Sequence, residues 1–328
     1  MIRSLYRCAD GQIRTNLTAE ELLAARSDAQ GLLWVDFNCA PADACEPILR
    51  DVFGFHPLAI DDALKETHVA RVDDWEQYLY LVLHTVELEE KYPLELRSLE
   101  LDVFLGTNYL VTHHERTMGA VDDIWHRWQS NERGLRSGPG RLLYELADQL
   151  VAAYLPVIDR MDDLVDHIEQ QMFDHPQPQI LEDLFRLRRA VVDMRRTIAP
   201  EREVLNRLAR DDFAVIDRRL RIYFRDVYDH LVRLHETCES LRDLAGGALE
   251  VYLSVVNNRL NDVMKTLTII TTLFMPISFL SGFFGMNFFQ PAQPLVAWTG
   301  MPALVATLAV MVLLPLGMFM WVRRRGWM

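Results

Sequence analysis

An uncharged run of 57 residues near the C-terminus limits the fold of this chain more than any other feature. No Asp, Glu, Lys, Arg or His occurs between Thr266 and Val322, whereas all 47 acidic residues and 31 of the 34 basic residues precede this run. About 20 apolar residues cross the hydrocarbon core of a bilayer as a helix. The run is therefore long enough for two membrane spans and a loop, and a purely soluble protein is not expected.

Charges and helix breakers divide this segment and orient it in the membrane. We expect a first span over about 266–285, an outer loop over 286–300 with several prolines, and a second span over about 301–322. Lys265 precedes the first span, and three arginines follow the second in a basic tail, 323–328. The positive-inside rule then places both termini in the cytoplasm, and we expect the protein in the cell's cytoplasmic membrane.

The charge balance indicates the class of partner. The formal net charge is −13, which argues against nucleic acid because phosphate backbones require clustered Lys and Arg, and which fits cations as partners. The cysteines form no CxxC pair and predict reduced thiols in a cytosolic compartment, without a disulfide framework or structural zinc. The N-terminus shows no secretory or transit signal. The four cysteines are Cys8, Cys39, Cys45 and Cys238.

Residues 1–118 have the composition of an N-terminal α/β cytosolic domain. Short apolar runs rich in β-branched and aromatic residues predict strands over 32–37 and 78–86. Residues 99–103 alternate apolar and polar, then a Gly-Thr-Asn turn leads into 109–112, a pattern that predicts a hairpin. The fold class expected for the whole chain is a predominantly α protein with an α+β cytosolic domain, a helical stalk and a two-helix transmembrane hairpin.

Residues 119–265 form the expected helical cytosolic domain. Its last stretch, 216–265, has an apolar stripe and no proline, which predicts a long stalk helix that continues into the membrane. An earlier helix carries closely spaced carboxylates, which predict either a solvated helix face or a cation-attracting surface. These residues are Asp159, Asp162, Asp163, Asp166 and Glu169.

One side of the first span carries small and polar residues at helical spacing. This stripe predicts either close helix packing or the wall of an aqueous pore. A pore without charge would not bind a dehydrated divalent ion tightly, and Mg²⁺ is the natural candidate because it gives up its waters reluctantly. The stripe consists of Thr268, Thr271, Met275, Ser278 and Gly282.

Several segments resemble one family of membrane proteins. The Gly-Met-Asn within Phe284–Phe288 matches the GMN signature that ends the first membrane helix of CorA-family divalent-cation channels. Residues 261–276 resemble the pore-helix entry of that family, 223–230 its stalk segment, and 55–62 a motif of its N-terminal domain. These segments follow one another in the family's order, so the resemblance covers essentially the whole chain.

The resemblance implies a homopentamer in the lipid bilayer, with a central pore formed by the first membrane helices. It implies influx of Mg²⁺ and Co²⁺, with Ni²⁺ as a further candidate, driven by the membrane potential. The selectivity filter would be Gly285, Met286 and Asn287, with Asn287 holding the hydrated ion. The pore-lining residues would be Asn261, Leu267, Thr271, Met275 and Ser278, with Leu267 and Met275 as the apolar constriction.

The resemblance also implies a regulatory metal site between subunits on the cytosolic side. Asp226 matches its stalk carboxylate, and a rough alignment gives Glu89 or Glu90 of a neighbouring subunit as its partner. Cytosolic Mg²⁺ at these sites would hold the stalks symmetric and closed. Mg²⁺ would thus be both transported and regulatory, and no organic cofactor is expected.

Two departures from the family pattern bear on the substrate. Residues 288–300 lack the acidic residue that many relatives carry after the GMN segment, so outer cation capture would be weaker or depend on Asn287 alone. Ser278 stands where threonine is frequent, which keeps the hydroxyl. The alternative transporter is a ZntB-like zinc importer with proton coupling, although Met286 favours the magnesium branch.

Other classes find less support in the sequence. Zinc transport would gain from clustered histidines, but His113 and His114 would point to opposite faces of a strand and are interpreted as surface or packed residues. A non-conducting membrane scaffold would need neither the GMN segment nor the polar stripe. The sequence contains no HExxH, GxSxG or P-loop motif that would indicate an enzyme. We therefore expect no enzymatic activity.

Overall fold

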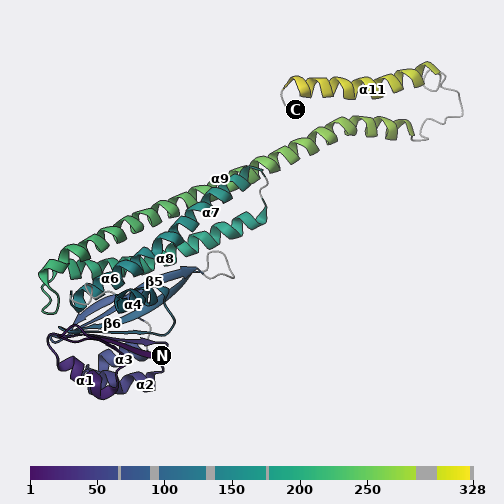
Figure 1. Ribbon diagram of the computed structural model, residues 1–328. Helices are drawn as coiled ribbons and strands as arrows, with labels where there is room; N and C mark the ends of the chain where they lie inside the picture. Colours follow the sequence, from purple (N-terminus) through teal and green to yellow (C-terminus); the bar gives the residue numbers. More distant parts are fainter. Residues whose placement is uncertain (66–67, 89–95, 131–136, 175–176, 286–300, 326–328) are drawn as a thin grey trace. The chain divides into compact units, whose positions relative to one another are not determined.

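The computed structural model describes residues 1–65, 68–88, 96–130, 137–174, 177–285 and 301–325. In these residues a mixed seven-stranded sheet lies at the N-terminal end of the chain (Figure 1). The strands are β1 (Ile2–Arg7), β2 (Ile13–Thr15), β3 (Leu32–Asn38), β4 (Arg71–Asp74), β5 (Leu79–Leu88), β6 (Leu96–Leu105) and β7 (Tyr109–His114).

The strand order is β2-β1-β3-β7-β6-β5-β4. The neighbours β3 and β7 run parallel, and every other neighbouring pair is antiparallel. The predicted hairpin is confirmed as β6 and β7, with Leu105 opposite Leu110. The other two predicted strands are present as β3 and β5, because runs rich in Val, Leu and aromatic residues fit a buried pleated surface.

Short helices cover one face of the sheet. They are α1 (Ala19–Ser27), α2 (Ala42–Pro47) with the π-helical turn η1 (Ile48–Val52), and α3 (Pro57–Lys65). Helix α1 begins at a capping box in which Thr18 and Glu21 bond each other's backbone N–H groups. Between these helices and the sheet lies an aromatic core that includes Phe55, stacked on Phe104 with ring centroids 4.2 Å apart.

Longer helices cover the opposite face (Figure 1). Because side chains alternate along a strand, Trp34 points to this second face and packs against Trp125 of α4 at 4.8 Å. The predicted helical region is confirmed, and both α6 and α8 begin with a proline, a favoured first residue. The helices are α4 (Gly119–Ser130), α6 (Pro139–Ala152), α7 (Tyr154–Asp174), α8 (Pro178–Arg210) and the short 3₁₀ helix η2 (Arg218–Leu220).

Helix α9 (Arg221–Gly285) is continuous from the stalk into the apolar segment, as predicted. The described residues divide into two compact units, Met1–Leu249 and Glu250–Met328, and α9 contributes to both. This division differs from the expected boundaries after residues 118 and 265, which were drawn from composition and stay predictions.

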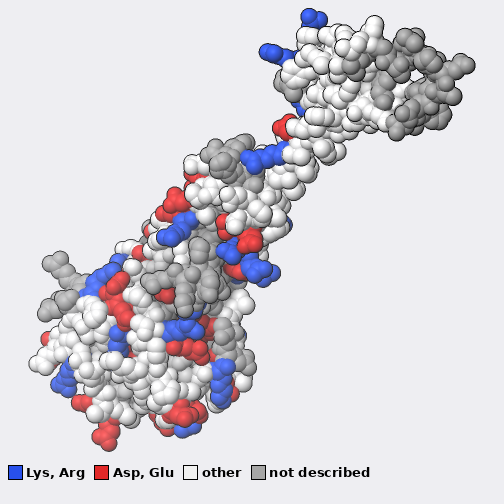
Figure 2. All heavy atoms as spheres, turned by 90° about the vertical axis from the view of Figure 1, so that its right-hand side faces the viewer, with Lys and Arg blue, Asp and Glu red and all other residues white. Residues whose placement is uncertain are grey.

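The second unit consists of the end of α9 and helix α11 (Met301–Arg324). Both helices are long and apolar enough to cross a membrane: one span lies within Arg218–Phe283 and the other is Val305–Arg324. Figure 2 shows the charged side chains gathered on the first unit, while the visible surface of the apolar helices is nearly free of them. The expected loop 286–300 lies outside the described residues.

Candidate functional site

The five residues expected to line a pore share one side of α9. At 3.6 residues per turn their positions fall within an arc of about 120°. All five are exposed on the single chain, including Leu267 at 56 % and Met275 at 65 %. The set consists of Asn261, Leu267, Thr271, Met275 and Ser278.

Part of the other side of the same helix is covered within the second unit. Ile269, which lies nearly opposite the stripe, is only 6 % exposed, and Leu273 and Leu280 on its side are half-buried. Val322 of α11 is buried as well. The stripe therefore lies on an exposed part of α9, which also includes the apolar side chains of Ile270, Phe274 and Phe279.

Two threonine hydroxyl groups on this face donate hydrogen bonds within their own helix. Thr271 Oγ1 donates to the carbonyl oxygen of Leu267 at 2.9 Å, and Thr268 Oγ1 donates to that of Met264 at 2.7 Å. Such bonds to the residue four positions earlier satisfy the hydroxyl proton within the helix. The lone pairs of these two hydroxyl oxygens remain available as hydrogen-bond acceptors, and the Asn261 side-chain amide can both donate and accept.

The expected filter begins where α9 ends. Gly285 is the last residue of the helix and is exposed. A glycine at this position allows another chain's backbone to approach closely because it has no Cβ. Met286 and Asn287 lie outside the described residues, so their roles stay predictions.

Asp226, the expected stalk carboxylate, is exposed on the first turns of α9. The structure brings Asp148 of α6 close to it, a residue that the sequence analysis missed. Burial raises the pKa of Asp148 most; His230 lowers it, and the negative charge of Asp226 raises it further. Two carboxylates near each other repel when both are ionised, and a cation would relieve that repulsion.

Aromatic and cationic packing holds α6 and α9 together at this point. The Arg141 guanidinium lies 4.6 Å from the ring of Tyr144 and 4.7 Å from that of Tyr223. Tyr144 also makes an edge-to-face contact with Phe224 at 6.3 Å. These contacts fix the two helices that carry the acidic pair.

The described residues of a single chain do not form a complete cation site. No group of three or more His, Cys, Asp or Glu side chains in that part of the chain is arranged to hold a metal ion. The expected partner acids, Glu89 and Glu90, lie outside the described residues. Any strong site at Asp226 and Asp148 therefore requires further oxygen ligands, since divalent cations bind through several.

The histidines, α7 aspartates and cysteines considered from the sequence have environments typical of structural or surface residues. His113 and His114 are packed, not exposed: His113 Nδ1 is 3.4 Å from Asp102, and His114 Nε2 is 3.3 Å from the buried Asp36. The aspartates of α7 are exposed and opposite its buried residues, as in a solvated helix face. All four cysteines are free thiols.

The described residues combine a sheet-containing domain with two helices long and apolar enough to cross a membrane, and comparison with known proteins identifies the family. The family model described as CorA-like Mg²⁺ transporter protein matches residues 29–324. The chain is 34 % identical over 281 residues to the cobalt/magnesium transport protein CorA of Thermotoga maritima, covering 85 % of this chain and 78 % of that protein.

Solved structures agree on the fold. The complete structure of the CorA magnesium transporter from Methanocaldococcus jannaschii superposes with a TM-score of 0.82 at 20 % identity, covering 99 % of this chain and 98 % of that one. The ZntB cytoplasmic domain from Vibrio parahaemolyticus matches more weakly, with a TM-score of 0.59, 13 % identity, and 70 % and 88 % covered. The chain belongs to the CorA-like family of divalent-cation transporters, a family of membrane transporters rather than enzymes.

Proposed function

We propose that this chain forms a homopentameric channel through which Mg²⁺ enters the cell, and that it also admits Co²⁺ and Ni²⁺. The stripe on α9 carries the proposal, because it gathers Asn261, Thr271 and Ser278 on one exposed arc of the helix. Copies of α9 around a common axis would turn these stripes toward a shared aqueous path. The sequence identity to the Thermotoga cobalt/magnesium transport protein supports the choice of cations.

The chemistry of the stripe suits an ion that keeps its water. Waters bound to a cation direct their hydrogens outward, so a wall of acceptors satisfies them without replacing them. Thr271 provides such an acceptor, and the Asn287 side chains would provide a ring of amide oxygens at the outer mouth. Leu267 and Met275 would close the path by excluding water when the pore narrows.

The membrane potential supplies the driving force in this scheme. A potential of 100 mV, negative inside, favours entry by about 2.3 kcal/mol per elementary charge, and thus by twice that for a divalent ion. This requires both termini in the cytoplasm and the loop 286–300 outside, in the cytoplasmic membrane. The arginines at the end of α11 support that orientation.

Regulation would act at the acidic pair on α6 and α9. Cytosolic Mg²⁺ would bind Asp226 and Asp148 together with Glu89 or Glu90 of the neighbouring subunit and hold the stalks closed. Loss of the ion would restore the repulsion between these carboxylates and let the stalks separate. The position of Asp148 supports this assignment: burial raises the pKa of its carboxyl group most, His230 lowers it, and the negative charge of Asp226 raises it further, a repulsion that a bound cation would relieve.

A ZntB-like zinc transporter coupled to protons is the second candidate. The fold is compatible with it, because a ZntB cytoplasmic domain shares this architecture. Met286 of the GMN segment and the absence of histidine between residues 266 and 322 favour magnesium.

Flux through the purified protein in liposomes separates the two candidates. We expect Mg²⁺ and Co²⁺ uptake that follows an imposed potential and is unchanged by a pH gradient. Zinc uptake that exceeds magnesium uptake and needs the pH gradient would favour the second candidate, and no flux of any divalent cation would contradict both.

Protease protection tests the regulatory site. Mg²⁺ should protect the wild-type protein and should protect the Asp226→Ala variant only at higher concentration. Glu236→Ala, an exposed acid further along α9, is the matched control. Equal protection of both variants would contradict the assignment of Asp226.

A further inference from the structure

Two helices are fastened to the sheet at one residue of β5. Strand β4 pairs with β5 only as far as Arg71 opposite Val82, which leaves the backbone of His84 at the edge of the described sheet. Side chains take the place of a strand there: Glu201 Oε2 of α8 accepts the His84 N–H at 3.0 Å, and the Tyr154 hydroxyl of α7 donates to the His84 carbonyl at 3.2 Å. Such capping satisfies an edge that would otherwise lose two hydrogen bonds.

Glu201 is an unusual residue for this task, because a neutral side chain would suffice. It has no exposed surface, and its Oε1 atom has no hydrogen-bond partner. Burial raises its pKa to about 8, although the nearby His84 opposes the shift. The carboxyl group is thus held in its protonated form near neutral pH, where an ordinary glutamate is ionised.

A line of titratable groups connects Glu201 with the far side of β5. The His84 imidazole lies between two carboxylates, with Nδ1 3.9 Å from Glu201 and Nε2 3.7 Å from Glu100. Glu100 Oε2 accepts the backbone N–H of His68 at 2.9 Å, and the His68 ring is 3.6 Å from Asp62. Glu100 stands directly opposite His84 in the β5–β6 register.

Other charged groups face this line from the neighbouring elements. Asp62 is paired with Arg71 of β4. Asp102 of β6 accepts a hydrogen bond from Tyr80 at 2.6 Å, and burial raises its pKa to about 6. Burial lowers the pKa of His84, but Glu100, Glu201 and Asp102 outweigh it, so the net shift is upward.

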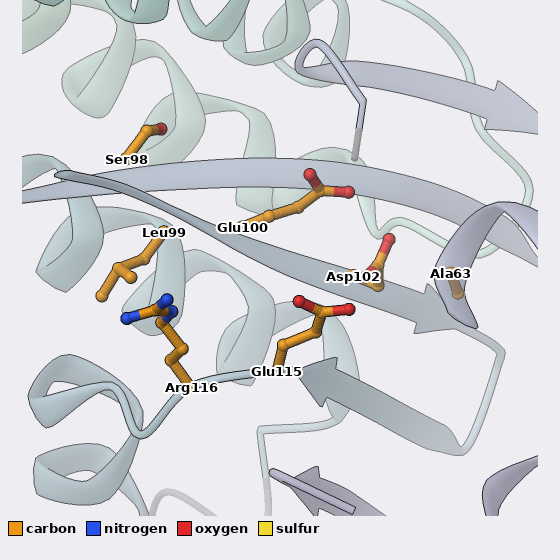
Figure 3. Close-up of a pocket in the computed structure, with 7 residues that line it drawn as sticks. All are labelled: Ala63, Ser98, Leu99, Glu100, Asp102, Glu115 and Arg116. Carbon is orange, nitrogen blue, oxygen red and sulfur yellow. The ribbon is translucent and has the colours of Figure 1, made fainter. Parts of the chain in front are cut away.

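Protons from solvent can reach this line through a pocket. Glu100 lines a pocket of about 200 Å³ together with Asp102, Glu115 and Arg116, and Figure 3 shows the three carboxylates gathered in it. The Glu100 side chain keeps 14 % of its surface exposed. The inner acid, Glu201, therefore has a route to solvent through His84 and Glu100.

Helix α8 also contacts the stalk within the same compact unit. Arg195 of α8 forms an ion pair with Glu239 of α9, and Arg207 of α8 donates to the Val72 carbonyl of β4 at 2.7 Å. Helix α8 thus contacts both the sheet and α9, the helix that continues into the apolar segment.

We propose that Glu201, His84 and Glu100 form a proton-dependent latch that fastens α7 and α8 to the edge of the sheet and loosens as cytosolic pH rises. The latch is a device of the sheet-containing unit and does not depend on the proposed cation sites. It would make the mobility of the stalk's supporting helix depend on pH.

The direction follows from proton linkage. The closed latch holds a proton on Glu201 up to a pH of about 8, whereas an opened, solvated glutamate releases it near its ordinary value of 4.5. The closed form therefore binds more protons between these values and is progressively lost as the pH rises through them. Above about pH 8 the effect of Glu201 is complete, because both forms are then ionised.

Hydrogen exchange on the full-length protein tests the latch. The exchange protection of the β5 amides, corrected for the intrinsic pH dependence of exchange, is measured from pH 6 to 9 in wild type and in Glu201→Gln. Glutamine keeps an acceptor for the His84 N–H but cannot ionise. The ratio of the protection factor in Glu201→Gln to that in wild type should increase by up to about tenfold per pH unit between pH 6 and 8. Above pH 8 this ratio should become constant.

Glu203→Gln, an exposed acid two residues along the same helix, is the matched control and should follow wild type at every pH. Glu201→Gln protection that parallels wild type at all pH values would show a merely structural role and overturn the proposal. The wild-type protein alone gives a second test: β5 protection that is constant from pH 6 to 9 would also contradict the latch.

Discussion

The two compact units of the chain place their apolar side chains in opposite ways. In Met1–Leu249 most of the large apolar residues are inside, and Trp34 and Phe104 have no exposed surface. In Glu250–Met328 residues of the same kind are outside, with Phe279 exposed to 70 % and Leu313 to 66 %. The exposed apolar surface of the second unit is thus suited to lipid or to protein contact, as expected of helices that cross a membrane.

Charges show the same contrast. The first unit buries charged groups and pairs them, as with Asp36, which contacts Arg3 at 2.7 Å and His114 at 3.3 Å. The described apolar helices contain no charge between Thr266 and Val322, and hydroxyls such as Thr271 bond their own helix. The apolar helices can therefore contact an ion only through neutral polar groups such as hydroxyls. Neutral groups of this kind fit the transport of a hydrated cation.

The largest predicted difference between the units concerns aromatic packing. Phe104→Ala should lower the free energy of unfolding by about 3–5 kcal/mol, because it opens a cavity in the aromatic core. Phe279→Ala, which leaves no cavity within the chain, should change it by less than about 0.5 kcal/mol. Urea denaturation in detergent measures both, and equal losses would contradict the contrast.

The second-largest difference between the two units is expected when an exposed leucine is replaced by arginine. Leu313→Arg should disfavour membrane insertion by about 2.5–3.5 kcal/mol, the cost of arginine near the centre of a spanning helix. Leu23→Arg on α1, where leucine is 49 % exposed to water, should change stability by less than about 0.5 kcal/mol. If the fraction of inserted chain is unchanged by Leu313→Arg, α11 does not span the membrane.

The smallest effect is expected at the acidic pair. The pKa of Asp148 is raised in the folded state, so ionisation of this residue destabilises the folded state. This loss of stability begins as the pH rises above the ordinary pKa of 3.8 and is complete above the raised pKa. Asp148→Asn should therefore stabilise the protein at pH 7 by less than about 1 kcal/mol and weaken the stabilisation by Mg²⁺.

Thermal unfolding with and without Mg²⁺ measures this effect. Asp159→Asn, an exposed acid of α7, serves as its control and should leave both values unchanged. A full Mg²⁺ response in Asp148→Asn would remove that residue from the proposed site.

Periodicity and composition predicted the elements that depend on neighbours along the chain. The strand pair β6–β7, the continuous α9 and the apolar α11 follow from alternation, from helical spacing without proline, and from a long uncharged run. Spacing also predicted that the small polar residues of α9 share one side of the helix, and they lie nearly opposite the buried Ile269.

Contacts between distant segments were not predictable in this way. Glu201 and His84 are 117 positions apart, and nothing near Glu201 in the sequence distinguishes it from the exposed Glu203. Asp148 was missed because it is one acid among many on amphipathic helices, and only the packing of α6 on α9 brings it near Asp226. Burial and proximity decide these roles, and both arise from tertiary structure.

The central claim is that a ring of Asn287 side chains admits hydrated Mg²⁺ to a path lined by α9. Mg²⁺ flux into liposomes, measured for Asn287→Ala after mass measurement confirms an intact oligomer, tests it most directly. Gln293→Ala, another amide of the loop 286–300, is the matched control. We predict that Asn287→Ala abolishes flux while Gln293→Ala retains it, and wild-type flux through an intact Asn287→Ala oligomer would contradict the claim.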